Sequence, residues 1–214
     1  MRRLLALPPW AELRRRLPRL LAGLVLCGVA FSLPIQAGLG VDPWDVLHLG
    51  IASRTGIPVG TVSVLVGLVV LIGWIPLRER VGIGTIANTL IIGAVIDVVL
   101  PHLPAADDRV TRWTMLLGGL ALAGPGIGLY IGARLGPGPR DGIMTGIARW
   151  GHSIRVVRTG IELIALLFGW LLGGTVGVGT VLFAVTIGPN AHYWLDRFDM
   201  GECPVGAEAV ALAD

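Results

Sequence analysis

The residues LGVDPWD at positions 39–45 reappear in altered form as LGPGPRD at positions 135–141. Each is followed by a second matched element, VGIGT at positions 81–85 and VGVGT at positions 176–180. Apolar sequences match one another by chance, but glycines, prolines and aspartates at a fixed spacing rarely do. The sequence therefore predicts that the chain contains two copies of one structural unit.

The residues around these motifs are mostly apolar. Hydrophobic residues occupy 54% of the 214 positions and charged residues 14%, against about 25% charged in a typical soluble domain. A soluble globule has too little interior to bury that much apolar surface, so the solvent should be lipid. The predicted fold class is an all-α integral membrane protein.

Six apolar runs are long enough to cross a hydrocarbon core ~30 Å thick. Each copy would hold three of them, with a short helix after the first. Because three is an odd number, the second copy must enter the membrane from the opposite side, an inverted-topology arrangement common in secondary transporters. The expected spans are residues 20–37, 59–75, 83–100, 115–133, 156–172 and 178–195.

The distribution of arginine predicts the orientation. All 17 basic residues are arginines, and with the amino terminus inside only Arg54, Arg109 and Arg112 lie outside. The positive-inside rule then puts both termini in the cytoplasm. The expected segments are a cytoplasmic, arginine-rich amphipathic segment (1–19), the first repeat (20–100), an external linker (101–114), the second repeat (115–195) and a cytoplasmic tail (196–214).

The two loop motifs each predict the start of a short helix. A proline would take the first helical position and an aspartate the third, where its carboxylate can meet free backbone N–H groups. Capping alone explains this spacing; the functional interpretation is that re-entrant helices hold a carboxylate at the mouth of a polar cavity. A flat interfacial helix is a further alternative. The residues concerned are Gly40, Pro43 and Asp45, and Gly136, Pro139 and Asp141.

The VGxGT elements would begin the third and sixth spans. Their small residues let helices approach closely and their threonines can cap the helix start, so packing is the default interpretation. They are not phosphate loops, because no lysine follows and no strand precedes them. The residues concerned are Gly84, Thr85, Gly179 and Thr180.

Glu162 is the clearest candidate for function among the polar residues of the spans. An ionised group there costs about 2.5–3.5 kcal/mol on insertion scales, and its repeat counterpart, Val66, is apolar. We expect Glu162 to face the interior and carry a coupling proton, with Arg158 as an alternative, structural partner. Helix packing or headgroup contact competes with solute or ion binding at the other candidates, Asp97, Asn88, Asn190 and His192.

Other function classes find little support. The chain has no paired carboxylates with a nucleophile, no Cys/His metal spacing and no Ser/His/Asp set, so we expect no enzyme, metal or cofactor. The arginines lie between apolar runs, whereas nucleic-acid binding uses clustered basic charge.

The motifs at residues 38–45 and 81–85 and their counterparts at 135–141 and 176–180 resemble the YczE/YyaS/YitT group of bacterial membrane proteins, over about residues 20–195. The resemblance implies a multi-pass protein of the bacterial inner membrane and supplies neither substrate nor site residues. Gly138 and Arg140 replace Asp42 and Trp44, so the two loops cannot have identical chemistry.

The function expected from these observations is a secondary transporter or permease for an unidentified small solute. Its partners would be the lipid bilayer and that solute, and a homo-oligomer is left open. A channel is the nearest rival, because two short helices from opposite faces could frame a fixed pore. A non-transporting accessory or assembly protein is the rival from another class.

Overall fold

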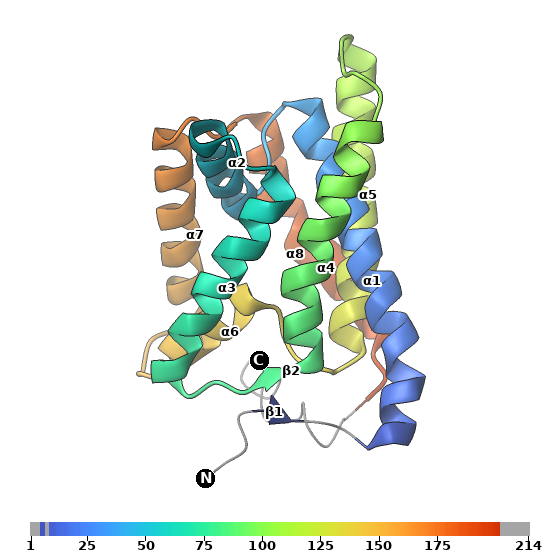
Figure 1. The fold of residues 1–214 in the computed structure, drawn as a ribbon, viewed down its shortest axis with the longest axis vertical. Coiled ribbons are helices and arrows are strands. Elements are labelled where there is room, and N and C mark those ends of the chain that lie inside the picture. The colour runs from blue at the N-terminus through green and yellow to red at the C-terminus, as the bar shows by residue number, and fades with distance from the viewer. Residues whose placement is uncertain (1–4, 7–8, 202–214) are drawn as a thin grey trace.

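The computed structural model describes residues 5–6 and 9–201, which form a helical bundle (Figure 1). Two short helices and a 3-10 turn lie between the long helices, and two strands of two residues each pair in parallel. The elements are β1 (Leu5–Ala6), α1 (Trp10–Ala37), α2 (Pro43–Thr55), α3 (Val59–Leu77), β2 (Val81–Gly82), α4 (Ile83–Val99), η1 (Leu100–His102), α5 (Arg109–Gly132), α6 (Pro139–Ala148), α7 (Ile154–Leu171) and α8 (Val178–Phe198).

Within the described residues, four helices are long and apolar enough to cross a membrane: α1, α3, α4 together with η1, and α5. The sequence predicted six spans, with α7 and α8 as the fifth and sixth. Helix α7 carries three charges, Arg155, Arg158 and Glu162, in 18 residues. Helix α8 has Pro189, Asn190 and His192 within its second half, which lower its hydropathy. Length and composition therefore support four of the six predicted spans within the described residues.

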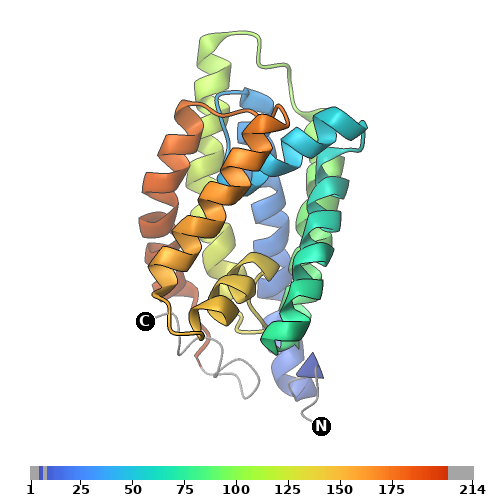
Figure 2. The same cartoon turned by 90° about the vertical axis from the view of Figure 1, so that its left-hand side faces the viewer.

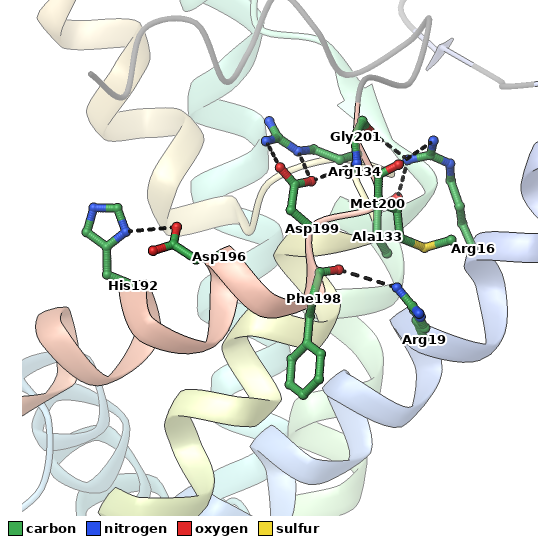
Figure 3. A network of polar contacts seen from close by, with 10 residues as sticks. All are labelled: Arg16, Arg19, Ala133, Arg134, His192, Asp196, Phe198, Asp199, Met200 and Gly201. Atoms are coloured by element: carbon green, nitrogen blue, oxygen red, sulfur yellow. Dashed lines mark hydrogen bonds and ion pairs between the residues drawn. The ribbon is translucent and has the colours of Figure 1, made fainter.

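Helix α1 extends beyond the predicted span 20–37 at its start, because it includes part of the arginine-rich segment. Arg16 is buried and donates hydrogen bonds to the carbonyl oxygens of Ala133 (3.3 Å) and Gly201 (3.1 Å) (Figure 3). An ion pair with Glu12 at 2.7 Å also holds it. From Trp10 on, the predicted segment 1–19 is thus the start of α1; residues 1–4, 7–8 and 202–214, with most of the predicted tail, lie outside the described part of the chain.

Helices α1 and α5 pack along each other and form the middle of the bundle. Glycines allow this approach: a β-carbon on Gly23 of α1 would lie 2.8 Å from the Gly126 carbonyl oxygen of α5. Around this pair, α4 packs on α1 and α8 on α5, while α3 packs on α4 and α6, and α2 packs on α7 (Figures 1 and 2). Leu20, Leu24 and Tyr130 lie in the buried core between them.

The loops after α1 and α5 make matching contacts with distant helix starts. The Leu39 carbonyl accepts from the Gly179 N–H of α8 at 2.8 Å, and the Leu135 carbonyl accepts from the Gly84 N–H of α4 at 2.9 Å. Each loop therefore fixes the start of a long helix in the other half of the chain.

Glycine and threonine residues make these loop contacts feasible. Gly40 and Gly136 have φ of 104° and 127°, in the region that favours glycine. A β-carbon on Gly40 would lie 2.6 Å from the Gly177 nitrogen. Thr85 and Thr180 each accept, at 3.3 Å, from the backbone N–H of the residue that caps their helix. Close packing and capping thus both occur where the VGxGT elements lie.

Adjacent helices α3 and α4 meet at a closely packed boundary, which we call the α3/α4 seam. A β-carbon on Gly60 would lie 1.9 Å from the Gly93 carbonyl oxygen, so only glycine allows this approach. The carboxylate of Asp97 accepts hydrogen bonds from the Gly60 N–H (2.6 Å) and the Thr61 hydroxyl (2.7 Å). The first bond satisfies a free backbone N–H at the start of α3, and both bonds tie α3 to α4.

Helices α7 and α8 occupy the corresponding places in the second half, and their boundary is the α7/α8 seam. They make little contact with each other, and Figure 1 shows them apart. A β-carbon on Gly188 of α8 would meet no atom within 4 Å. Helix α7 instead packs closely on α2, where a β-carbon on Gly169 would lie 2.4 Å from the Leu47 nitrogen.

Candidate functional site

The two short helices lie near opposite ends of the bundle (Figures 1 and 2), and their first residues approach one another. Helix α2 begins at Pro43 after Asp42, whose carboxylate accepts from the backbone N–H groups of Trp44 (2.7 Å) and Asp45 (3.0 Å). Helix α6 begins at Pro139 after Gly138, with no side-chain cap. The prolines suit the first helical turn because their missing N–H is not needed there.

Asp45 and His48 form a buried pair on α2. Their side chains are one turn apart, and Asp45 Oδ1 lies 3.0 Å from His48 Nδ1. Asp45 is 3% exposed and His48 is 1% exposed. Burying two polar side chains is tolerable only when they satisfy each other's hydrogen-bonding groups, and this pair does so.

Arg140 of α6 lies close to the carboxylates of Asp42 and Asp45 at the start of α2. Its guanidinium lies 3.5 Å from the Asp42 carboxylate and 3.7 Å from that of Asp45. The same guanidinium stacks on the ring of Trp44, with Cζ 5.2 Å from the ring centroid, an arrangement favourable to a cation. The position that carries Trp44 in the first loop thus carries its partner, Arg140, in the second.

A second group of polar atoms surrounds the start of α6. A β-carbon on Gly138 would lie 3.2 Å from Asp141 Oδ2, 3.5 Å from Asn88 Nδ2 and 3.5 Å from the Tyr130 hydroxyl oxygen. Glycine at this place, where the first loop has Asp42, leaves room for these three side chains. A carboxylate here would also stand directly beside that of Asp141.

Glu162 lies beside this region on α7 and is paired. Its carboxylate accepts from Arg158 Nε at 2.9 Å, and the two side chains are 33% and 55% exposed. Arg158 is also an electrostatic neighbour of Asp141. The sequence analysis gave pairing with Arg158 as the structural alternative to a proton-coupling role for Glu162, and the structure brings these two side chains together.

Three other candidates lie away from these groups. Asp97 belongs to the α3/α4 seam. Asn190 donates from Nδ2 to the Leu120 carbonyl at 2.7 Å and so joins α8 to α5. His192 is 79% exposed and lies 3.9 Å from Asp196 on the same helix (Figure 3). Their contacts in the described chain are therefore those of helix packing or of the surface.

Sequence reasoning missed several members of the site. Arg140 appeared only as a departure from the first loop, and His48 was not considered. His48 could have been found from its position three residues after Asp45, which places both on one helix face. The contact between Arg140 and Asp42 depends on how two loops far apart in sequence approach, and no local pattern reports that.

The site suits the binding of a small polar or charged species. It assembles the carboxylates of Asp42, Asp45 and Asp141 with the guanidinium of Arg140 between apolar helices. Such charges in a membrane protein are expensive and usually mark a path for ions or solutes. Within the described residues, no three His, Cys, Asp or Glu side chains are grouped so as to hold a metal ion.

Comparison with known proteins places the chain among bacterial membrane proteins. The model of the family of unknown function DUF6198 matches residues 14–195. An "Uncharacterized protein" of Haemophilus influenzae is 39% identical over 87% of this chain and 86% of its own length. The "Uncharacterized membrane protein YczE" of Bacillus subtilis is 36% identical over 78% and 79%, and YyaS of the same organism is 26% identical over 81% and 89%. No solved structure matches.

Proposed function

The chain belongs to the DUF6198 family, and we propose that this multi-pass membrane protein is a secondary transporter or permease for a small solute in a bacterial inner membrane. The observation that carries the proposal is the approach of two short helices from opposite ends of the bundle, where Arg140 of α6 meets Asp42 and Asp45 of α2. Transporters built from inverted repeats bind their solutes between the halves, at the ends of such interrupted helices.

The proposed architecture has six spans arranged as 3+3 inverted repeats, with α7 and α8 as the fifth and sixth. The matching contacts of the two loops support it, because Leu39 holds the start of α8 and Leu135 holds the start of α4. Backbone geometry supports it as well: Gly38 and Arg134, 96 positions apart, have φ of 62° and 55°. A positive φ is uncommon for arginine, so its occurrence at the equivalent position favours a shared ancestry.

The difference between the two seams favours a transporter over a fixed channel. Alternating access needs one part of the bundle to move against the rest. The α7/α8 seam leaves α7 little attached to α8, whereas the α3/α4 seam is held by Gly60, Gly93 and Asp97. The facing short helices are also what a channel would use, so the channel stays the second candidate.

A solute screen in proteoliposomes, run with and without an imposed proton gradient, tests the proposal. We expect saturable uptake that follows the gradient and is lost in Arg140→Gln. His192→Ala is the matched control, since its side chain is exposed and outside the site. Non-saturable flux would favour the channel. Absence of any flux, together with co-purification of a stable partner, would favour the accessory protein.

The proposed orientation has both termini in the cytoplasm and the loop before α5 outside. It can be tested with a single cysteine introduced at Asp107, in the loop between η1 and α5, and labelled in intact cells with a reagent that does not cross the membrane. Labelling from outside is expected. A cysteine at this position that reacts only after the cells are opened would contradict the inverted arrangement.

A further inference from the structure

The side chains of Asp42, Asp45, His48 and Arg140, which we call the α2 charge cluster, carry an unbalanced charge. Two carboxylates face one guanidinium, so the cluster has a net charge of −1 when the imidazole is neutral. One added proton makes it neutral. Because buried surroundings disfavour net charge, this arrangement suits the uptake of a single proton.

Hydrogen bonding indicates where that proton would lie. The carboxylate of Asp42 accepts from two backbone N–H groups at the start of α2, and such bonds favour its charged form. Asp45 and His48 lie 3.0 Å apart, close enough to share a proton between carboxylate and imidazole. In a pair coupled this closely the proton belongs to both residues.

Arg140 gives this proton an effect on the other half of the chain. At 3.5 and 3.7 Å its guanidinium attracts both carboxylates, yet these contacts are longer than the about 2.7–3.2 Å of a good N–H···O bond. Attraction between opposite charges therefore dominates the tie between α2 and α6. Neutralising one carboxylate would weaken that tie and leave the arginine free to move.

Trp44 provides an independent indication that something else binds here. Its ring contacts the Arg140 guanidinium, it is 8% exposed, and its indole N–H has no acceptor among the described residues. An unsatisfied buried donor costs about 1–3 kcal/mol. A water molecule or a polar atom of a solute beside Arg140 would satisfy it.

The other charges that face this region do not remove the imbalance. Asp141 and the Tyr130 hydroxyl lie near the start of α6, and Asp141 adds further negative charge. Arg158 and Glu162 on α7 neutralise each other at 2.9 Å. Glu162 therefore already has a cation for its carboxylate, whereas Asp42 and Asp45 share one.

We propose that the α2 charge cluster binds and releases one proton, and that this proton is the one coupled to solute movement. The coupling rests on the transport function proposed above; the proton site itself does not. Binding of the proton loosens the attraction between α2 and Arg140, and its release restores that attraction. One chemical event would thus change the contact between the two halves of the bundle.

Proton uptake by the purified, full-length protein tests this directly. A weakly buffered sample is titrated from about pH 8 to about pH 5, and the protons bound per chain are compared among variants with the same elution volume on gel filtration. We expect wild type to bind one proton more than Asp45→Asn. Glu162→Gln should bind as many as wild type, and Arg140→Gln should bind its proton at least about tenfold more tightly, because a nearby positive charge is gone.

Two results would overturn the site: equal proton uptake by Asp45→Asn and wild type, or loss of one proton in Glu162→Gln. Should Asp45→Asn fail to fold, an unchanged titration midpoint in Arg140→Gln would overturn it equally. The transport proposal fails separately. Asp45-dependent proton uptake without solute flux under any gradient would contradict coupling and leave the proton site standing.

Discussion

The α3/α4 and α7/α8 seams occupy corresponding places in the two halves, yet only the first is closed. Gly93 packs against Gly60, while a side chain at Gly188 would meet open space. Asp97 accepts hydrogen bonds from the first turn of α3, while its counterpart His192 lies at the surface. The same chain thus builds one fixed and one loosely packed boundary from similar sequences.

This difference indicates where the bundle can move. Closely packed helices deform little, because their side chains and backbones leave no free space between them. The α3/α4 seam also has charge-assisted hydrogen bonds. Among the described residues, the α7/α8 seam has neither close packing nor such hydrogen bonds. We therefore expect α7, together with α2 on which it packs, to move against the rest.

The largest effect is expected from filling the fixed seam. In Gly93→Leu the new side chain would begin 2.4 Å from the Gly60 carbonyl oxygen, so α3 and α4 must separate, at a cost of about 3 kcal/mol. The matched change is Gly188→Leu, which has free space and should cost little. Thermal unfolding in detergent micelles measures both. Equal losses of stability would show that the two seams are packed alike.

Removing the carboxylate of the fixed seam should have the next largest effect. Asp97→Ala leaves the Gly60 N–H and the Thr61 hydroxyl without their acceptor, which should cost about 2 kcal/mol. His192→Ala should change stability by less than about 0.5 kcal/mol, since that side chain is exposed. Comparing the unfolding temperatures of the two variants checks this. A loss from His192→Ala as large as that from Asp97→Ala would contradict the comparison.

A smaller effect is expected where α3 meets α6. Trp74 is buried and donates from its indole N–H to the Pro139 carbonyl at 3.0 Å. Trp74→Phe removes that bond and should cost about 1 kcal/mol. Its counterpart on α7, Trp170, is exposed, so Trp170→Phe should leave the unfolding temperature unchanged in the same assay.

The smallest effect is expected outside both seams, at the end of α8. The Arg134 side chain donates to the Asp199 carboxylate at 2.8 Å and holds its pKa below the usual range. Because the pKa of Asp199 is lower in the folded state, its carboxylate stabilises the fold at pH values above the pKa of the unfolded state. This stabilisation disappears as the pH falls through the pKa of the folded state. Asp199→Asn should therefore cost about 0.5 kcal/mol at neutral pH and nothing in acid. A loss of stability in Asp199→Asn that persists in acid would show that packing, and not the ion pair, causes the loss.

Apolar runs predicted the long helices well, because hydrophobic length is a local property. The predicted span starts at residue 20, whereas the helix that contains it, α1, starts at Trp10 and includes Arg14, Arg15 and Arg16. Arg16 is buried through contacts with Ala133 and Gly201, far away in sequence. No local pattern predicts such partners.

The candidate site shows the same division between local and distant information. Pro43 and Asp45 indicated a short helix from neighbouring residues alone. The side chain that caps this helix is Asp42, whereas the Asp45 carboxylate pairs with His48. The role of Arg140 depends on the approach of two loops 96 positions apart. The partner of Asp97 likewise lies on another helix, so a headgroup contact seemed sufficient from the sequence alone.

Distances between paired spin labels across the two seams test the account most directly. Labels on Ile72→Cys and Leu90→Cys span the α3/α4 seam, and labels on Phe168→Cys and Val185→Cys span the α7/α8 seam at corresponding, exposed positions. In liposomes we expect a narrow, unchanging distance for the first pair. The second pair should give a broad distribution that shifts between neutral and acidic pH. Two narrow distributions, both independent of pH, would contradict a moving α7 and favour a fixed pore.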